Sequence, residues 1–397
     1  MTWVFWIALV CLVYAYAGFP LLLWLRARLF PRPHREEDGT PSVSVVIAAY
    51  NEAAHIAARI ENLLSQDYPA DRLEIIVASD GSADDTNQIV QSYGHRNVQL
   101  LALPRQGKGL ALNAAAAAAT GEILVFSDAN TRFRPDALRQ LSRHFADTFV
   151  GGVVGNQVYL RGEQASSTAD GERLYWNFDQ WLKSLQSRAG SVTSATGAIY
   201  AIRRNLHEDV PADAMDDFYV STGVVQRGYR LVFAPAAQAF EPVAEAEGVE
   251  FSRKLRVITQ GLQAVIYRRD LLNPFRFGFY AWQLFSHKVL RRLVGIPLLV
   301  MAITCPGLYG RGWVYQLALA MEVAFLVLFA AAFFLRGTPW GKWKPLTIAW
   351  YFVMVNTAAL VSAMAILRGH RVRRWEPERH QAAPPDETIK PVETVVG

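Results

Sequence analysis

The sequence predicts an α/β protein with a mostly parallel sheet and helices on both of its faces, flanked by membrane-spanning helices towards both ends. Residues 3–25 carry no charged side chain and are long enough to span a bilayer as a helix. Within residues 41–250, short runs of Val, Ile, Leu and Phe alternate with helical patterns, which is typical of βαβ units. Two of these runs lead directly into carboxylates, at Asp80 and Asp128.

The chain of 397 residues is 52% hydrophobic, and its mean hydropathy of +0.11 is high for a soluble protein. The apolar excess is local, because it lies in residues 3–25 and in three later stretches, 293–309, 313–335 and 346–367. We therefore predict an N-terminal membrane helix with a basic linker (1–40), a cytoplasmic domain (41–250), amphipathic or interfacial helices (251–292), and C-terminal membrane helices (293–369). The tail, residues 370–397, is rich in charge and proline and is predicted to be disordered.

Basic residues beside the apolar stretches indicate the orientation in the membrane. The four arginines that follow the first stretch place the domain in the cytoplasm, and the basic cluster at residues 287–292 agrees. Three C-terminal spans would leave the tail outside, whereas the arginines at residues 368–374 favour the inside. The sequence leaves this conflict open. The alternative is that one of the three stretches is re-entrant or interfacial. Residues 3–25 lack the basic start and the cleavage site of a secretory signal.

The formal net charge of +5 lies mainly in these juxtamembrane clusters, which favours anionic lipid headgroups over nucleic acid as the partner of the basic residues. The two cysteines, Cys11 and Cys305, fall in or beside the apolar stretches. They imply neither a disulfide framework nor a cysteine zinc site.

The elements of the domain follow in order. Strands are predicted at 42–49, 73–79, 98–103 and 122–127, and helices at 53–66, 84–93 and 110–119. After Gly151 the pattern loosens. Residues 175–185 are aromatic and amphipathic, which fits a helix at the membrane interface or in the core equally well. For residues 273–287, which lead directly into an apolar stretch, the interfacial interpretation is the stronger.

Acids at strand ends suggest the kind of ligand. In open α/β sheets, ligands bind at the carboxyl ends of the strands. Carboxylates alone would repel a phosphate, but a divalent cation can bridge carboxylate and diphosphate oxygens. Asp80 and Asp128 therefore suggest either a metal–phosphate ligand or a sugar.

Six short motifs occur in one order along the domain. They are residues 50–52 (Tyr-Asn-Glu), 80–84 (Asp-Gly-Ser-Ala-Asp), 107–113 (Gly-Lys-Gly and, four residues on, Asn), 128–130 (Asp-Ala-Asn), 196–198 (Thr-Gly-Ala) and 216–217 (Asp-Asp). In this order they resemble family 2 glycosyltransferases, which are inverting enzymes of GT-A fold. The resemblance covers about residues 41–256, and the flanking spans are similar to the membrane-bound, polysaccharide-synthase-like branch.

The resemblance assigns the donor side of the site. It implies that Tyr50 and Glu52 line a nucleoside pocket, that Asp80 accepts hydrogen bonds from the base, and that Lys108 contacts the diphosphate. Asp-Gly-Ser is also ordinary turn chemistry, and the Gly-Lys-Gly of residues 107–109 would by itself be a solvated turn. Asp84 and Asp85 are explained equally well by a helix start.

The metal motif departs from the family's Asp-x-Asp pattern. The resemblance implies that Asp128 and Asn130 bind Mg²⁺ or Mn²⁺, but the second ligand here is a neutral amide. An amide oxygen can ligate a hard cation, although it should do so more weakly than a carboxylate. A turn at the end of the strand is the alternative.

The acceptor side contains a pair of adjacent acids. By resemblance Asp217 is the general base, Asp216 is its neighbour, and Thr196 and Gly197 form the floor of the acceptor site. Two adjacent acids in a partly buried cleft raise the pKa of at least one of them, which suits a base. Acids in the first turn of a helix are the common alternative.

The Gln-x-x-Arg-Trp motif of processive synthases is altered in this chain. The matching stretch, residues 253–257, reads Arg-Lys-Leu-Arg-Val, so that Arg256 remains to neutralise a leaving diphosphate. The missing glutamine and tryptophan put a stacking platform for a growing polymer in doubt, and a basic interfacial helix is the alternative.

Together these features predict an inverting glycosyltransferase, multi-pass in the cell (inner) membrane with a cytoplasmic catalytic domain. It would transfer a hexose or N-acetylhexosamine from a nucleotide sugar, with UDP-linked donors favoured, to a membrane-associated lipid or polysaccharide in envelope glycan synthesis. Other envelope-glycan assembly proteins would be its partners. The alternatives are a polyprenyl-phosphate sugar transferase and a non-catalytic nucleotide-sugar-binding subunit of a polysaccharide export complex.

Overall fold

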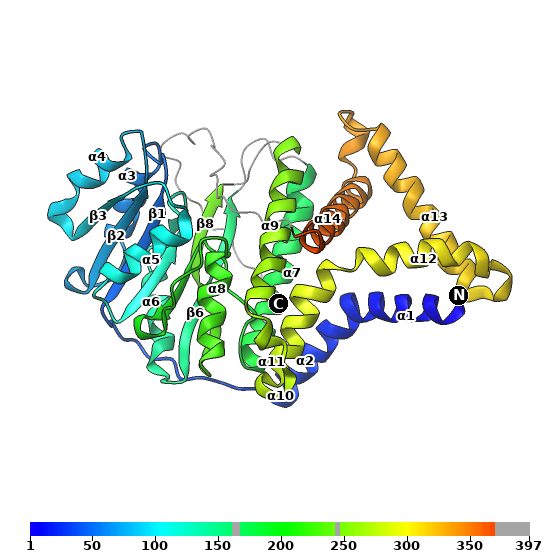
Figure 1. The fold of residues 1–397 in the computed structure, drawn as a ribbon, viewed down its shortest axis with the longest axis horizontal. Helices are drawn as coiled ribbons and strands as arrows, with labels where there is room; N and C mark the ends of the chain where they lie inside the picture. Colours follow the sequence, from blue (N-terminus) through cyan, green and yellow to red (C-terminus); the bar gives the residue numbers. More distant parts are fainter. Residues whose placement is uncertain (161–166, 243–246, 370–397) are drawn as a thin grey trace.

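The computed structural model describes residues 1–160, 167–242 and 247–369. Within them, eight strands form one sheet in the order β3-β2-β1-β4-β7-β6-β8-β5 (Figure 1). The strands are β1 (Val43–Ala49), β2 (Leu73–Asp80), β3 (Val98–Leu103), β4 (Ile123–Ser127), β5 (Arg132–Phe133), β6 (Val150–Leu160), β7 (Tyr200–Arg203) and β8 (Arg230–Pro242).

The sheet is parallel in one half and mixed in the other. β3, β2, β1 and β4 all run parallel, as the sequence predicts. β7 then pairs antiparallel with both β4 and β6, β6 pairs parallel with β8, and β5 pairs antiparallel with β8. The long strands β6 and β8 lie in the region where the sequence pattern loosens.

Helices cover both faces of the sheet, so that its strands are buried on both sides. The side chains of β1 alternate between two cores: Val45 and Ile47 face one, and Val46 and Ala48 face the other. The first core includes residues of α3 (Ile56–Leu64), α4 (Thr86–Ser92) and α6 (Ala137–Ser142), and the second includes residues of α5 (Lys108–Ala118) and α8 (Asp216–Gln226). This two-sided burial explains why these strands are continuous apolar runs.

The long helix α7 (Ser167–Ala189) contains the aromatic segment for which two positions were possible. Leu182 and Leu185 are buried in a cluster with Phe19 and Leu23 of the N-terminal helices, whereas Trp181 is 43% exposed. The C-terminal part of α7 therefore packs between the sheet domain and the N-terminal helix.

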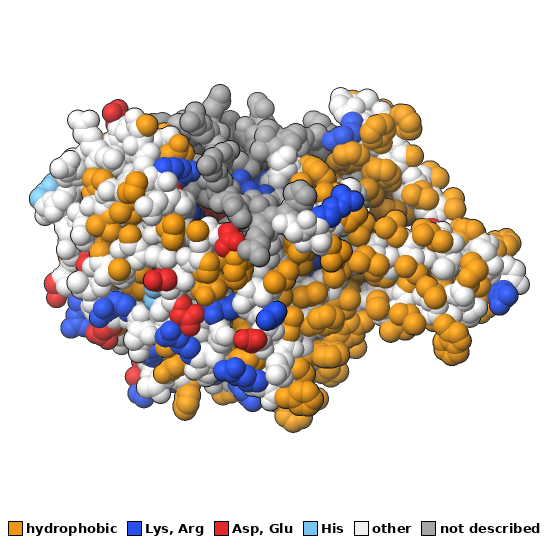
Figure 2. Space-filling view, viewed as in Figure 1, with side chains coloured by type: hydrophobic (Ala, Val, Ile, Leu, Met, Phe, Trp, Pro, Cys, Tyr) orange, Lys and Arg blue, Asp and Glu red, His pale blue; other side chains and the backbone are white. Residues whose placement is uncertain are grey.

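Helices at both ends are long and apolar enough to cross a membrane. One is the 28-residue segment Thr2–Leu29, made of α1 (Thr2–Val13), a π-helical segment (Tyr14–Gly18) and α2 (Phe19–Leu29). The others are α13 (Trp313–Phe334) and α14 (Lys344–Leu367). In Figure 2 hydrophobic side chains dominate the face of these helices, while charged side chains gather on the sheet domain.

The predicted span at 293–309 is shorter than expected. Its helix, α12 (Gly295–Leu308), has 14 residues, and it follows α9 (Glu247–Tyr267), α10 (Pro274–Phe277) and α11 (Phe279–Leu284). The segments Phe279–Arg292 and Gly295–Arg311 meet at an angle of 55°, as in a broken span or a re-entrant loop. The described part of the chain thus has three candidate spans, or four if this bent pair is counted as one.

Contacts between these helices give their relative order. α12 lies beside α1 (Figure 1). Near the start of α1, the Trp6 indole donates a hydrogen bond of 3.1 Å to the hydroxyl of Tyr315, which lies in α13. α14 instead packs against α9, where the Thr259 hydroxyl donates to that of Ser362 at 2.9 Å. α13 therefore begins far from the sheet domain, whereas the C-terminal half of α14 lies beside a helix of that domain. Cys11 and Cys305 are both free.

Candidate active site

The carboxyl ends of β1, β2 and β4 meet at one edge of the sheet. β1 lies between the other two in parallel register, with Ala49 opposite Ser79 and Ile47 opposite Ser127. At these strand ends lie Tyr50 to Glu52, which follow β1, Asp80, the last residue of β2, and Asp128, which follows β4. The sheet thus brings together three of the sequence motifs.

Asp80 fixes the loop between β3 and α5. Its side chain is 1% exposed and accepts hydrogen bonds from the backbone N–H groups of Gln106 (2.6 Å) and Gly107 (2.9 Å). It also pairs with Arg105 at 2.5 Å, and the Arg105 guanidinium lies 3.5 Å from the centre of the Tyr50 ring. The predicted contacts of Asp80 and Tyr50 with a nucleobase stay predictions, and the geometry adds a loop-holding role for Asp80.

Lys108 joins the two groups of acids. It is the first residue of α5, directly after Gly107, whose φ of +110° favours glycine. Its Nζ lies 2.7 Å from Asp128 Oδ1 and 3.3 Å from Asp216 Oδ2. Burial alone would lower the pKa of Lys108, but Asp128 and Asp216 raise it above its ordinary value. Lys108 is therefore a charged bridge between the predicted metal motif and the predicted catalytic pair.

Asp216 and Asp217 lie in the first turn of α8, as the helix-start alternative describes. Asp217 is 7% exposed and accepts a hydrogen bond of 2.6 Å from the Phe218 backbone N–H. Burial, and then the charge of Asp216, raise the pKa of Asp217 to about 7. A carboxyl with such a pKa can exchange a proton near neutral pH, so the helix start and a general-base role are compatible here.

Gly197 lies against the metal motif. A Cβ atom on Gly197 would lie 3.1 Å from Asp128 Oδ2 and 3.5 Å from Lys108 Nζ, so a side chain here would press on the Asp128 carboxylate. The buried Oγ1 of Thr196 has no hydrogen-bond partner among the described residues. A buried hydroxyl without a partner is costly, and a bound ligand would relieve that cost.

Two further acids of the site have a raised pKa. Glu241, near the end of β8, accepts hydrogen bonds from Thr131 Oγ1 (2.9 Å) and Gln157 Nε2 (2.6 Å). Burial, and then the charge of Asp128, raise the pKa of Glu241 to about 7. The same two causes, with Asp84 as a third, raise the pKa of Glu52 to about 7. The sequence reasoning missed Glu241, because its strand was not predicted and a single acid at a strand end is a weak signal.

The acids around Asp128 suit a divalent cation. Asp128 and Asn130 lie at the end of β4, and the electrostatic effect of Asp128 reaches Glu52 and Glu241. A cation would relieve the mutual repulsion of these carboxylates, and their oxygens together with the Asn130 amide are the ligands that Mg²⁺ and Mn²⁺ prefer. The residues present thus fit a metal, and Asp128 with Asn130 as its ligands remains a prediction.

Arg256 lies half-buried on α9. This helix packs against both α8, which carries the acid pair, and α14. The predicted contact of Arg256 with the diphosphate stays a prediction.

The sheet topology and the acids at its strand ends define a GT-A glycosyltransferase domain. Residues 44–210 match the family described as Glycosyl transferase family 2, and this part of the chain belongs to that family. The match includes the site from Tyr50 to Gly197, and the acid pair at residues 216–217 follows directly after it.

Comparisons with known proteins agree on this class. The chain is 27% identical over 233 residues to an N-acetylglucosaminyltransferase from Mesorhizobium japonicum, covering 54% of this chain and 55% of that protein. It is 26% identical over 266 residues to a poly-beta-1,6-N-acetyl-D-glucosamine synthase from Staphylococcus aureus, covering 64% of this chain and 63% of that protein. The chain thus spans less than two thirds of the length of these relatives.

A solved structure shares the fold over most of the chain. It is a mannosyltransferase from Pyrobaculum calidifontis in complex with GDP-Man and Mn²⁺. It superposes with a TM-score of 0.68 and 23% identity, covering 92% of this chain and 99% of that one. At this identity the likeness concerns the fold.

Proposed function

We propose that this protein is a membrane-integrated, inverting glycosyltransferase that transfers a hexose or N-acetylhexosamine from a UDP-linked sugar to a membrane-associated lipid or polysaccharide. The observation that carries the proposal is the bridge of Lys108, which links Asp128 to Asp216 beside a buried Asp217 with a pKa of about 7. This arrangement puts a cation for the diphosphate and a base for the acceptor in one site. The N-acetylglucosaminyl relatives favour N-acetylglucosamine as the sugar.

In the proposed reaction Asp217 removes the proton of the acceptor hydroxyl as that oxygen attacks the anomeric carbon. The bond from this carbon to the diphosphate breaks on the opposite face, which inverts the configuration. Lys108 and Arg105 would balance negative charge on the diphosphate oxygens. A divalent metal held by Asp128 and Asn130 would supply further charge neutralisation for the leaving diphosphate. The partnerless hydroxyl of Thr196 would hydrogen-bond to the acceptor or sugar.

We further propose that the catalytic domain and the end of α14 lie on the same, cytoplasmic side of the membrane. The segment Thr2–Leu29 crosses towards the domain, α12 returns beside α1, and the C-terminal half of α14 packs on α9. Between the end of α12 and the end of α14 the chain then returns once from the far side of the membrane to the cytoplasmic side. This agrees with the arginines after residue 367.

The test compares nucleotide release from a panel of donor sugars in the parent protein and in Asp217→Asn. Membranes containing the protein are incubated with individual UDP-sugars, GDP-mannose and either Mn²⁺ or Mg²⁺, and nucleotide release is measured. We expect release with one UDP-sugar and a loss of roughly 10²–10⁴-fold in Asp217→Asn, the usual scale for removing a general base. Donor binding should be unchanged in this variant. If donor binding falls in step with activity, Asp217 is not the base, and if every donor binds without release, the non-catalytic subunit is favoured.

One observation favours a second candidate, transfer to a polyprenyl phosphate. The charge of Lys288 lowers the pKa of Asp217, although by less than burial, Asp216 and Lys108 change it. A second lysine whose charge reaches the base would attract an anionic acceptor. A phosphate acceptor needs little deprotonation, so activity that is insensitive to Asp217→Asn and dependent on Lys288 would support this candidate.

A further inference from the structure

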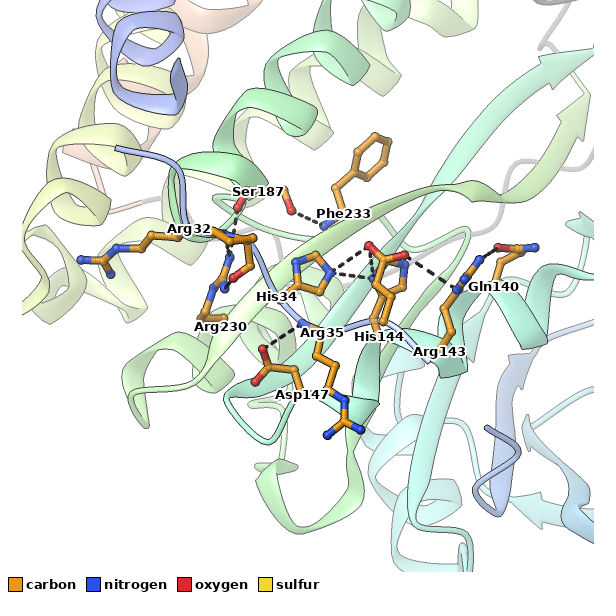
Figure 3. Close-up of polar contacts among 12 residues, drawn as sticks. Arg32, His34, Arg35, Gln140, Arg143, His144, Asp147, Ser187, Arg230 and Phe233 are labelled. Carbon is orange, nitrogen blue, oxygen red and sulfur yellow. Dashed lines mark hydrogen bonds and ion pairs between the residues drawn. The ribbon is translucent and has the colours of Figure 1, made fainter. Parts of the chain in front are cut away.

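The linker, residues 30–42 between α2 and β1, has no regular secondary structure but is bound to the sheet domain at several points. Figure 3 shows Arg230 and Asp147 beside it. The bonds are Arg32 N–H to Arg188 O (2.8 Å), Arg230 to Arg32 O (2.7 Å) and Pro33 O (3.0 Å), Arg35 N–H to Asp147 Oδ2 (3.2 Å), and Glu37 N–H to Arg143 O (3.1 Å). They hold the backbone on both sides of His34 and Glu36, so these two side chains are positioned in advance.

Three potential metal ligands converge between these bonds. His34 Nε2 lies 2.7 Å from His144 Nδ1, and Glu36 Oε1 lies 3.4 Å from the first nitrogen and 3.5 Å from the second (Figure 3). His144 belongs to the 3-10 turn Arg143–Ala146 that follows α6. The side chains of His34 and His144 are 11% and 6% exposed, whereas Glu36 is 42% exposed and leaves the cluster open to solvent on one side.

We propose that His34, Glu36 and His144 bind one divalent transition-metal ion of the Zn²⁺ class, which fastens the linker to the catalytic domain. Two imidazoles and one carboxylate, with solvent in the fourth position, are an established ligand set for zinc. Imidazole nitrogens also discriminate against Mg²⁺ and Ca²⁺, which prefer oxygen ligands.

The distances are close to those that a tetrahedral ion needs. With bonds of about 2.0–2.1 Å, ligand atoms lie roughly 3.3 Å apart. The two distances from Glu36 fit this value, and the imidazole nitrogens need to separate by about 0.6 Å from their 2.7 Å contact.

The surrounding charges permit a dication. Arg143 approaches Glu36 through the other carboxylate oxygen, with Nε 3.7 Å from Oε2, so Oε1 faces the imidazoles. The charge of Arg230 also reaches His34, and Asp147 contributes a further carboxylate whose charge acts on both His34 and Arg230. This site is separate from the catalytic one, because its ligands come from the linker and the turn after α6, whereas the active-site acids lie at the ends of β1, β2, β4 and β8 and at the start of α8.

The proposed ion would strengthen the attachment of the linker to the catalytic domain. The linker connects the membrane helix Thr2–Leu29 to β1, the central strand between β2 and β4. An ion shared by the linker and the domain would fix the position of the catalytic edge relative to the membrane. Without the ion, the imidazoles would share one hydrogen bond and the linker would open more readily.

The full-length protein in detergent, stripped with a chelator and saturated with Mg²⁺, is titrated with Co²⁺ as a spectroscopic probe for Zn²⁺. We expect one equivalent of Co²⁺ with the visible absorption of a four-coordinate nitrogen–oxygen site, displaced by Zn²⁺. His144→Gln and Glu36→Gln should each weaken binding by at least 10–100-fold, in line with the loss of a metal ligand or its support. Because the half-exposed Glu36 can be replaced with little risk to folding, that variant keeps the test decisive if His144→Gln does not fold.

Two controls separate this site from others. His95→Gln, at an exposed histidine, and Asp128→Asn, in the catalytic metal motif, should both keep the Co²⁺ spectrum. Zn²⁺ should also slow tryptic cleavage after Arg35 several-fold in the parent protein and not in Glu36→Gln. Equal Co²⁺ binding in the parent and in both ligand variants, loss of the spectrum in Asp128→Asn, or cleavage unaffected by Zn²⁺ would each overturn the proposal.

Discussion

At the scale of single residues, the site depends on groups that hold one another in unusual states. Lys108 keeps its charge although it is buried, because Asp128 and Asp216 lie within 2.7 and 3.3 Å of its Nζ. In Asp217, by contrast, burial and the charge of Asp216 oppose ionisation and raise the pKa. The positive charge of Lys108 thus stabilises a cluster of carboxylates that would otherwise repel one another.

The raised pKa of Asp217 predicts how turnover depends on pH. A general base acts in its deprotonated form, so kcat/KM should rise with pH and level off above about 7. The measurement is initial-rate kinetics from pH 5.5 to 8.5 with saturating metal. In Asp217→Asn the residual rate should lose this inflection. A profile of the variant with the same inflection would assign it to another group, such as Glu52 or Glu241, whose pKa values are also about 7.

Gly197→Ala should lower activity by about tenfold or more without unfolding the protein. The new Cβ would lie 3.1 Å from Asp128 Oδ2 and 3.5 Å from Lys108 Nζ, so the carboxylate has to move from its place beside the lysine. A displacement of this kind away from productive geometry is costly in catalysis. The matched control is Gly94→Ala, where a Cβ meets nothing within 4 Å. Equal activity of the two variants, measured as nucleotide release, would contradict the close approach.

At the scale of elements, parallel strands and one loop bring the site together. Residues far apart in sequence meet because β1 lies between β2 and β4 and all three end at the same edge. The loop between β3 and α5 joins them through Asp80, which accepts bonds from Gln106 and Gly107 and pairs with Arg105. These contacts of Asp80 hold Lys108 in position at the start of α5.

Asp80→Asn should loosen that loop. The amide keeps one acceptor oxygen but loses the ion pair with Arg105 and part of the bonding to the backbone N–H groups. Charge-assisted bonds of this kind contribute about 1.5–3 kcal/mol, so we expect the free energy of unfolding to fall by about 2 kcal/mol. Nucleotide affinity should fall with it, because Arg105 and Lys108 lose their positions. Chemical denaturation and nucleotide titration measure both quantities.

Asp71→Asn is the control for this change, because Asp71 is exposed in the short turn before β2. Its free energy of unfolding should stay within about 0.5 kcal/mol of the parent. If Asp80→Asn behaves like the control in stability yet loses nucleotide binding, Asp80 contacts the base as the family resemblance implies and does not hold the loop.

At the scale of the whole molecule, apolar helices and a charged catalytic domain form two regions. Large hydrophobic side chains stand exposed along the helices, among them Trp3 (81%), Leu326 (59%) and Phe334 (79%). Exposed to water they would each cost on the order of 1–3 kcal/mol, a cost that a bilayer removes. The two regions are in direct contact where α9 packs against α14.

The proposed orientation can be tested with single cysteines in a background of Cys11→Ser and Cys305→Ser. Ser65→Cys marks the catalytic domain, Gly310→Cys the connection between α12 and α13, and Arg368→Cys the end of α14, all at exposed positions. In vesicles of known orientation, a membrane-impermeant maleimide should label positions 65 and 368 from the cytoplasmic side and position 310 from the other. Labelling of 310 and 368 from the same side would contradict the single return across the membrane.

The sequence by itself determined the parallel half of the sheet, the long apolar helices and the order of the site motifs. Local patterns carry this information: β1, β2 and β4 are apolar runs buried on both faces, and each ends at the polar residues of a motif. The first helices were also predicted, although α3 begins at Ile56, later than the pattern suggested, after a turn in which Asn51 has a φ of 55°.

The tertiary structure alone decided which of these residues interact, because such contacts depend on distance in space and have no local pattern. The bridge from Lys108 to both Asp128 and Asp216 joins three motifs, and Glu241 reaches Asp128 from a strand that pairs with β6. Likewise His34 and His144 are 110 positions apart and meet only because the linker crosses the turn after α6. Local sequence fixes the elements here, whereas the packing of sheet, linker and apolar helices assembles the sites.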